Sequence, residues 1–351
     1  MSEKKDDYDF LEIVEIQRRL LPELTDVLMK RYNLLRLIHY HQPIGRRSLS
    51  QQMNIGERMV RSEVNMLKEQ GFIEIKPQGM NTTEFGENSL EVLRNFIRNY
   101  KKLYELEKLV AKKLGIKKVL IASGNYDEDK LIIGDVGNVA SKYLKTILKD
   151  NMVVGITGGN TMKMLAQEMS KGTQKPFKVT VVPGRGGLGK DVSKQANAIA
   201  ANLAQKLKAS YKILHMADNI SRELLNTLME DPYTKEVIEY INKIETFAFG
   251  IGRADKMANR RGLSKEKIVE LSKHKAVAEA FGYYFNKNGQ IVQEANTIGV
   301  SLKHYKRLEY VIGAAVGSDK AEAIVAISKL NNNLVLVIDE GLAIKILDII
   351  T

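Results

Sequence analysis

The chain has 351 residues, a length that suits one small and one large domain better than a single compact one. Hydrophobic residues make up 44% and charged residues 27%, which is typical of a folded protein with a real core. It contains no cysteine, so disulfides, thiolate metal sites and cysteine catalysis are excluded, and a cytoplasmic protein is expected. No apolar run approaches the roughly 18 residues of a membrane span, and the charged residues 2–7 do not resemble a signal peptide.

The charge balance favours polyanionic partners. Lysine and arginine total 54 against 42 acidic residues, a net charge of +12. Basic proteins bind nucleic acid because each neutralised phosphate releases condensed counterions. Charge alone leaves two interpretations open, a nucleic-acid-binding protein and a merely basic soluble one.

Two helices are expected before residue 43. Apolar residues recur at helical spacing over 10–21 and again over 24–38, with Pro22 between the two runs. Proline suits the first turn of a helix, where its missing N–H costs nothing. Pro43 and Gly45 then interrupt the pattern.

A helix–turn–helix follows. A short helix is predicted over 47–53 and a second over 57–70, whose apolar face has three- and four-residue steps. The tight turn 54–56 between them ends at Gly56, which we expect to take a positive φ. The outward residues at the front of the second helix include arginine and asparagine, which can bind guanine and adenine from the major groove.

A hairpin is predicted directly after this pair. Residues 72–75 and 80–83 read as strands and 76–79 as the turn, with Lys76 near the tip. A helical pair and hairpin that simply pack together is the alternative, but the order is that of a winged helix. The predicted DNA-binding residues are Arg46, Arg47, Arg58, Arg61, Ser62, Asn65 and Lys76.

Residues 88–114 contain no glycine or proline and are predicted to form one long linker helix. Such a helix can pair two subunits of a homo-oligomer, a dimer or tetramer, or pack on its own chain. The sequence leaves both open. The predicted domains are therefore a winged helix-turn-helix domain at 1–87, the linker helix at 88–114 and an α/β domain at 115–351.

From residue 115 on, strand-like runs alternate with helices. This alternation predicts a Rossmann-like, mainly parallel sheet covered on both faces. Ligands of such folds bind at the carboxyl ends of the strands.

Glycine clusters follow two of these strands. Residues 155–161 combine glycine amides, hydroxyls and a helix N-terminus, which together predict a phosphate cradle, with a structural turn as the alternative. Residues 184–189 match the glycine pattern of dinucleotide-binding folds. No acidic residue follows about 20 positions later, as that fold requires, and lysines stand there instead. We therefore expect a compact phosphate here and no nicotinamide cofactor.

Further basic groups follow later strands, at Arg253, Arg260, Arg261 and Lys320. Several such groups beside two glycine clusters predict an anion with more than one phosphate.

Five stretches carry a resemblance to a known family; they are 157–161 (TGGNT), 183–187 (PGRGG), 257–261 (MANRR), 279–285 (EAFGYYF) and 336–341 (LVIDEG). Over nearly its whole length the chain resembles the sugar-responsive transcription repressors of the SorC class, and among them those that govern glycolysis in Gram-positive bacteria. The resemblance implies a sensor domain similar in fold to sugar-phosphate isomerases and deaminases. It also implies repression of a glycolytic operon that fructose-1,6-bisphosphate relieves.

The same resemblance implies the effector contacts. They fall on Gly158, Gly159, Asn160, Thr161, Arg185, Gly186, Gln195, Arg260, Glu279 and Lys320. Asn160 departs from the hydroxyl residue frequent in the family, and Arg253 and Asp255 have no role that the family assigns.

A sugar-phosphate isomerase or deaminase with a DNA-binding appendage is the rival interpretation. Those reactions need a carboxylate base and usually a histidine or a second carboxylate. The carboxylates Asp339 and Glu340 end a strand, but none of the five histidines falls in a glycine loop. A purely architectural DNA protein would leave both phosphate cradles unexplained. We expect operator DNA, a phosphorylated sugar and a second copy of the chain as partners, with no catalytic residue, metal, cofactor or membrane involved.

Overall fold

The computed structural model describes residues 16, 19–169, 178–187, 191–216 and 220–350. Its contacts divide the chain into two compact units, Met1–Lys102 and Leu103–Thr351. In the described ranges, no helix is both long and apolar enough to cross a membrane. The helix predicted over 10–21 lies largely outside the described residues.

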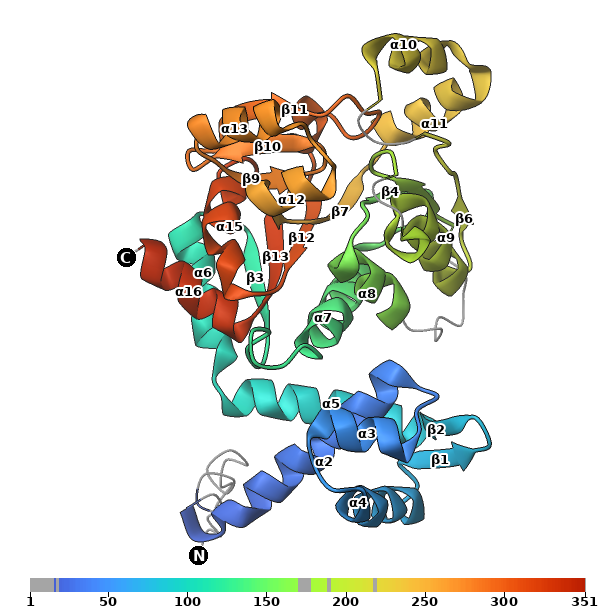
Figure 1. Cartoon of the computed structure of the whole chain (residues 1–351), viewed down its shortest axis with the longest axis vertical. Helices are drawn as coiled ribbons and strands as arrows, with labels where there is room; N and C mark the ends of the chain where they lie inside the picture. Colours follow the sequence, from blue (N-terminus) through green and yellow to red (C-terminus); the bar gives the residue numbers. More distant parts are fainter. Residues whose placement is uncertain (1–15, 17–18, 170–177, 188–190, 217–219, 351) are drawn as a thin grey trace, which may run out of the picture. The chain divides into compact units, whose positions relative to one another are not determined.

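The first unit contains the predicted helix–turn–helix and hairpin (Figure 1). Its elements are α2 (Pro22–His41), α3 (Arg46–Met53), α4 (Glu57–Glu69), β1 (Ile73–Lys76), β2 (Gly79–Thr82) and α5 (Glu84–Tyr100). Pro22 occupies the first turn of α2, as expected. Apolar side chains from α2, α3 and α4, including Ile38, Leu49 and Val64, are fully buried. The winged helix-turn-helix order is confirmed.

One detail of the turn between α3 and α4 was predicted wrongly. Asn54, not Gly56, has the positive φ, at 51°, whereas Gly56 has a φ of −62° and precedes α4. Asparagine tolerates the left-handed region because its short polar side chain can hydrogen-bond locally. The turn is closed by Ser50, whose hydroxyl donates to the Ile55 carbonyl at 2.6 Å.

The antiparallel hairpin of β1 and β2 is the wing of the winged helix, and Ile44 pairs with its second strand. Lys76 pairs with Gly79, so it lies at the tip as predicted. Ile44 forms an isolated bridge with Met80. A Cβ on Gly79, whose φ is 142°, would lie 2.8 Å from the Ile44 amide nitrogen. This close approach of two backbones is the physical reason for glycine at position 79.

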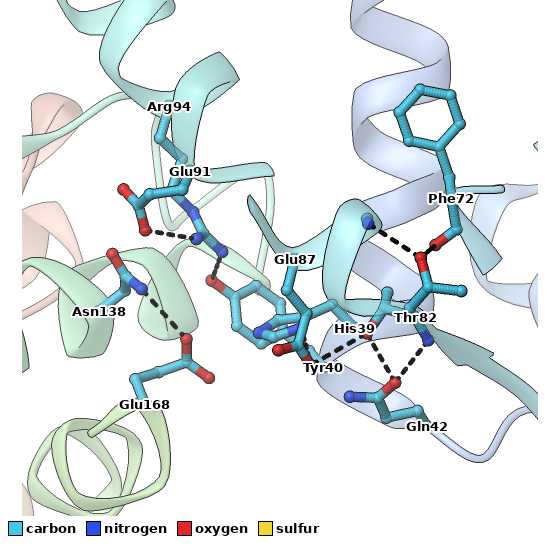
Figure 2. A network of polar contacts seen from close by, with 12 residues as sticks. His39, Tyr40, Gln42, Phe72, Thr82, Glu87, Glu91, Arg94, Asn138 and Glu168 are labelled. Carbon is cyan, nitrogen blue, oxygen red and sulfur yellow. Dashed lines mark hydrogen bonds and ion pairs between the residues drawn. The ribbon is translucent and has the colours of Figure 1, made fainter. Parts of the chain in front are cut away.

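Polar contacts join α2, β2 and α5 within the first unit (Figure 2). The Gln42 side-chain oxygen accepts from the Thr82 amide at 2.7 Å and from its hydroxyl at 2.9 Å. Arg94 of α5 donates to the Tyr40 hydroxyl of α2 at 2.8 Å and pairs with Glu91 at 3.5 Å. Because these groups fix α5 to the winged helix, α5 belongs to that unit.

The predicted single linker helix over 88–114 is instead two helices. α5 ends at Tyr100, and α6 (Leu103–Leu114) begins the second unit. Between them Lys102 has a φ of 52°, which no helix interior allows. Neither glycine nor proline marks this break, so the sequence pattern did not predict it.

A seven-stranded sheet forms the centre of the second unit, in the order β3-β13-β12-β7-β4-β5-β6 with every neighbouring pair parallel. Its strands are β3 (Lys118–Ala122), β4 (Val153–Ile156), β5 (Thr180–Pro183), β6 (Ser210–Tyr211), β7 (Thr246–Gly250), β12 (Tyr310–Ala315) and β13 (Leu334–Asp339). The predicted α/β class with a parallel sheet is confirmed.

Both faces of this sheet are covered. Successive side chains of one strand enter opposite cores, as Val119 and Leu120 of β3 do. One core is closed by α7 (Ile132–Ile147), α8 (Asn160–Glu168) and α9 (Ala196–Leu207). The other is closed by α6, α11 (Pro232–Asn242), α15 (Ala321–Ser328) and α16 (Glu340–Ile350). The remaining helical segments are η1 (Val192–Lys194), α10 (Arg222–Glu230), α12 (Ala254–Arg260), α13 (Lys265–Lys273), α14 (Leu302–Tyr305) and η2 (Ser318–Lys320).

A second, smaller sheet was not predicted. It has four antiparallel strands in the order β11-β10-β9-β8, formed by β8 (Gly252–Arg253), β9 (Ala276–Ala280), β10 (Tyr283–Asn286) and β11 (Ile291–Glu294). β9 and β10 contribute to the core under the large sheet through residues such as Ala278 and Phe285. A strand of two residues such as β8 is too short to show a periodic pattern in the sequence.

Candidate effector site

A cavity of about 410 Å³ lies in the second unit, where strands of the large sheet end. Thr157 follows β4, Arg185 follows β5 and Ile251 follows β7, and all three line it. Val316, after β12, lines it too. Its volume is within the range of small-molecule sites, and its place is where ligands of parallel sheets bind.

The cavity brings together all but one of the residues expected to contact the effector. Those that line it are Gly158, Gly159, Asn160, Thr161, Arg185, Gly186, Arg260, Glu279 and Lys320. Gln195 is not among them; its side-chain oxygen would lie 3.2 Å from a Cβ on Gly187, in the second glycine cluster. Their contact with a ligand stays a prediction.

The first glycine cluster leads from β4 into α8. Gly159 precedes α8 with a φ of 112°, and its amide donates to the Lys194 carbonyl at 2.8 Å. A Cβ on Gly158 would lie 2.6 Å from that same carbonyl oxygen. Because the Gly159 amide is already bonded, the groups of this cluster that could bind an anion are those of the first turn of α8, at Asn160 and Thr161.

The second glycine cluster is fixed by backbone bonds. Gly184 donates to the Ile156 carbonyl at 2.8 Å and Gly186 to the Ile298 carbonyl at 3.1 Å. Arg185 forms an isolated bridge with Gly299. The Gly186 amide is therefore engaged within the protein, and the predicted contact of Gly186 with an effector stays a prediction. The last residues of the glycine pattern, 188–189, lie outside the described residues.

A buried ion triad lies at one wall of the cavity. Glu279 Oε1 accepts from Arg185 Nη1 at 3.0 Å, from Arg261 Nη2 at 2.7 Å and from the Gly282 amide at 3.0 Å. Burial on its own would raise the pKa of Glu279, but the charges of Arg261 and Arg185 and the Gly282 amide hold that pKa below its ordinary value. Glu279 is thus a charged carboxylate that holds the side chains of Arg185 and Arg261 in place.

A cluster of charges at the cavity was only partly foreseen. Lys256, Arg253 and Asp319 line the cavity beside Lys320. Asp319 Oδ2 lies 2.5 Å from Lys256 Nζ and 3.5 Å from Arg253 Nη1. Burial lowers the pKa of Lys320, and the neighbouring Asp319 and Asp339 charges oppose that shift. The sequence signal for Lys256 was its position one helical turn from Arg260, which places both on the exposed side of α12.

The two carboxylates that could have suggested catalysis have structural partners. Asp339 accepts from the amides of Gly317 at 2.9 Å, Tyr126 at 3.2 Å and Leu342 at 3.2 Å. Burial raises its pKa, although these amides act in the opposite direction. Glu340 accepts from the Gly124 amide at 2.8 Å. Both residues therefore hold the loops after β3 and β12, and neither lines the cavity.

None of the five histidines, all of which lie in described parts of the chain, lines the cavity. His304 interacts instead with the Ile244 carbonyl at 2.9 Å. The acid–base pair that sugar-phosphate isomerisation usually needs is thus not assembled around this cavity by a histidine.

In the first unit, α4 presents a polar face. Val60, Val64 and Leu67 are buried beneath it. All seven side chains predicted to bind DNA are exposed, namely Arg46, Arg47, Arg58, Arg61, Ser62, Asn65 and Lys76. Glu63 on the same helix binds Arg31 of α2 at 3.0 Å, which fixes α4 against its neighbour.

Known proteins resemble both units. Residues 27–97 match the model of the CggR N-terminal DNA-binding domain, and residues 98–348 match the Sugar-bind model of sugar-binding domains. The central glycolytic genes regulator of Bacillus subtilis is 38% identical over 96% of this chain and 98% of its own length. The chain belongs to the SorC family of transcriptional regulators, in the group of the central glycolytic genes regulators.

Further relatives agree with this membership. The central glycolytic genes regulator of Priestia megaterium is also 38% identical, over 94% of this chain and 97% of its own. A SorC family regulator from Enterococcus faecalis has 35% identity and a TM-score of 0.65 over 69% of this chain and 99% of its own. The full-length sorbitol operon regulator SorC from Klebsiella pneumoniae, 17% identical, has the same fold, with a TM-score of 0.67 over 91% of this chain and 98% of its own. The family member described here is therefore a transcriptional regulator with a DNA-binding domain and a sugar-binding domain.

Proposed function

We propose that this regulator represses a glycolytic operon, and that a phosphorylated sugar, fructose-1,6-bisphosphate, relieves its binding to operator DNA. The observation that carries the proposal is the cavity, in which the first turn of α8 faces the same space as Arg185, Arg260 and Lys320. A helix N-terminus and several cations in one cavity favour a ligand with more than one phosphate. The choice of glycolytic genes as the target rests on the names of two relatives, both called central glycolytic genes regulators.

The DNA contact is proposed at α4. Its exposed Arg58, Arg61, Ser62 and Asn65 would read base edges in the major groove, with Lys76 of the wing and the start of α3 binding phosphates. The protein would act in the cytoplasm, where operator DNA is, as a homo-oligomer on repeated half-sites. It would need no cofactor and would carry out no reaction on its effector.

Effector and operator would be coupled through two states of the regulator. A ligand shifts such an equilibrium only by its differential affinity for the two states, typically about 1–3 kcal/mol. Reciprocity requires that operator DNA weaken effector binding by the same factor as the effector weakens operator binding.

The test is a titration of DNA from upstream of a glycolytic operon with the full chain, with and without fructose-1,6-bisphosphate. Sedimentation of the same mixtures reports the assembly. We expect weaker operator binding with the bisphosphate than with fructose-6-phosphate. Operator affinity and assembly that stay the same with every sugar phosphate would contradict the proposal. Turnover of hexose phosphates by the same preparation would favour the rival isomerase or deaminase.

A further inference from the structure

The cavity contains a carboxylate among its cations. Asp319, in the 3-10 turn η2 after β12, accepts from Lys256 at 2.5 Å and from Arg253 at 3.5 Å. These three residues and Lys320 all line the cavity. Asp319 thus lies where a ligand's anionic group would meet the same cations.

The Arg253 guanidinium contacts two carboxylates, those of Asp255 and Asp319. Its Nε and Nη2 donate to Asp255 at 3.0 and 2.7 Å, which is a bidentate pair. Its contact with Asp319 is the longer one. The bidentate pair holds the Arg253 guanidinium in place whatever its third nitrogen binds, so that nitrogen can exchange one anion for another.

Asp319 is also accessible. About a third of its side chain, 34%, is exposed, and the Lys256 side chain is 65% exposed. Exposed ion pairs of this kind contribute little to stability, because water screens both partners, and each partner can therefore exchange one counter-ion for another. A phosphoryl group has a charge of about −1.5 to −2 at neutral pH, more than one carboxylate carries.

We propose that Asp319 is a built-in competitor: its carboxylate occupies the cationic end of the cavity in the free protein, and one phosphoryl group of a two-phosphate effector replaces it. This inference rests on the proposed function, since it concerns the same cavity. A ligand anchored by its other phosphate at α8 brings the second group to the cations at a high effective concentration, which a free anion lacks. Asp319 therefore keeps orthophosphate out and reserves this end for an anchored ligand.

The decisive variant is Asp319→Asn, which removes the competing charge and keeps the shape. We expect it to bind fructose-1,6-bisphosphate about fivefold more tightly than the wild type, the upper range for one exposed ion pair. Fructose-6-phosphate, anchored at α8 alone, should bind both proteins equally. Orthophosphate should bind more tightly to the variant than to the wild type, because the cationic end of the cavity is then open to it. Calorimetry of the full chain measures all three.

Glu322→Gln is the matched control, because Glu322 is exposed on α15, close in sequence and outside the cavity lining. It removes the same charge and should leave the three affinities unchanged. A second variant, Lys256→Gln, removes a cation that the replacing phosphoryl group would use. It should weaken the bisphosphate and leave the monophosphate unchanged.

Bisphosphate affinity in Asp319→Asn that is equal to or weaker than in the wild type would overturn the inference, as would a Lys256→Gln protein that binds the bisphosphate normally. Either result leaves the proposed function intact as long as the wild type binds the bisphosphate. If the wild type binds no sugar phosphate, the proposed function fails. The orthophosphate comparison then still decides whether Asp319 excludes anions from this end.

Discussion

Arg185 Nη1 lies 3.0 Å from Glu279 Oε1, in a contact buried from solvent between residues 94 positions apart in the sequence. Arg261 binds the same oxygen at 2.7 Å. One carboxylate thus fixes two guanidinium groups, of which that of Arg185 lines the cavity. Because charges buried without a partner are costly, this triad makes the cavity's shape depend on Glu279.

Glu279→Gln should lower the free energy of unfolding by about 3 kcal/mol, since it removes the negative charge that Glu279 places against two buried guanidinium groups. Chemical denaturation of the full chain at neutral pH measures this, with the exposed Glu322→Gln as the control. A loss as small as that of the control would mean that the triad is not a stabilising element.

The stability difference between the wild type and Glu279→Gln should also depend on pH. The folded-state pKa of Glu279 is lowered, so its contribution to stability is complete above the ordinary glutamate pKa of about 4.3 and is lost as the pH falls through the lower folded value. The difference in stability between wild type and Glu279→Gln should therefore narrow on acidification below that range. A difference that is constant or grows in acid would contradict the assignment of a charged Glu279.

Arg185→Ala should reduce the affinity for fructose-1,6-bisphosphate at least about tenfold, the order of one charge-assisted hydrogen bond. Operator binding without effector should be unchanged, because Arg185 lies in the second unit. Arg222→Ala, an exposed arginine of α10, is the control. Loss of operator binding along with effector binding would show that the Arg185 loop is needed for the fold itself.

Arg58→Ala and Arg61→Ala should each weaken operator binding. A side chain that binds a phosphate should also reduce the slope of log affinity against log salt by about one, whereas one that reads a base should relax sequence preference instead. Lys303→Ala removes an exposed positive charge from α14 of the other unit and should change neither quantity. If both arginine variants bind like the wild type, the DNA surface lies elsewhere.

Gly79→Ala should distort the wing, because its Cβ would lie 2.8 Å from the Ile44 amide and its φ is 142°. Strain of this kind costs about 1–3 kcal/mol. We expect faster amide exchange over residues 73–82 in the full chain and weaker operator binding. Gly45→Ala is a close control, since nothing lies within 4 Å of its Cβ. Equal exchange in the two variants would exclude the predicted clash.

The sequence by itself determined the elements whose pattern is local. The three- and four-residue steps of Val60, Val64 and Leu67 placed α4, and alternating apolar runs predicted the parallel sheet. The strand-to-helix step at Gly159 indicated an anion-binding loop at a strand end. Each of these depends on residues that are near one another in the chain, so a short stretch of sequence contains the whole signal.

Only the tertiary structure decided which side chains meet. Glu279 could equally have faced a sugar hydroxyl, but folding brings it to Arg185 and Arg261 instead. Asp319 pairs with Lys256, which lies 63 residues earlier in the sequence. The helix ends before Lys102, whose φ is positive, although no glycine or proline stands there. Such contacts depend on how strands and loops distant in sequence pack. For the Glu279 triad, the electrostatic energy that holds the charges together becomes large only once folding has excluded water from between them.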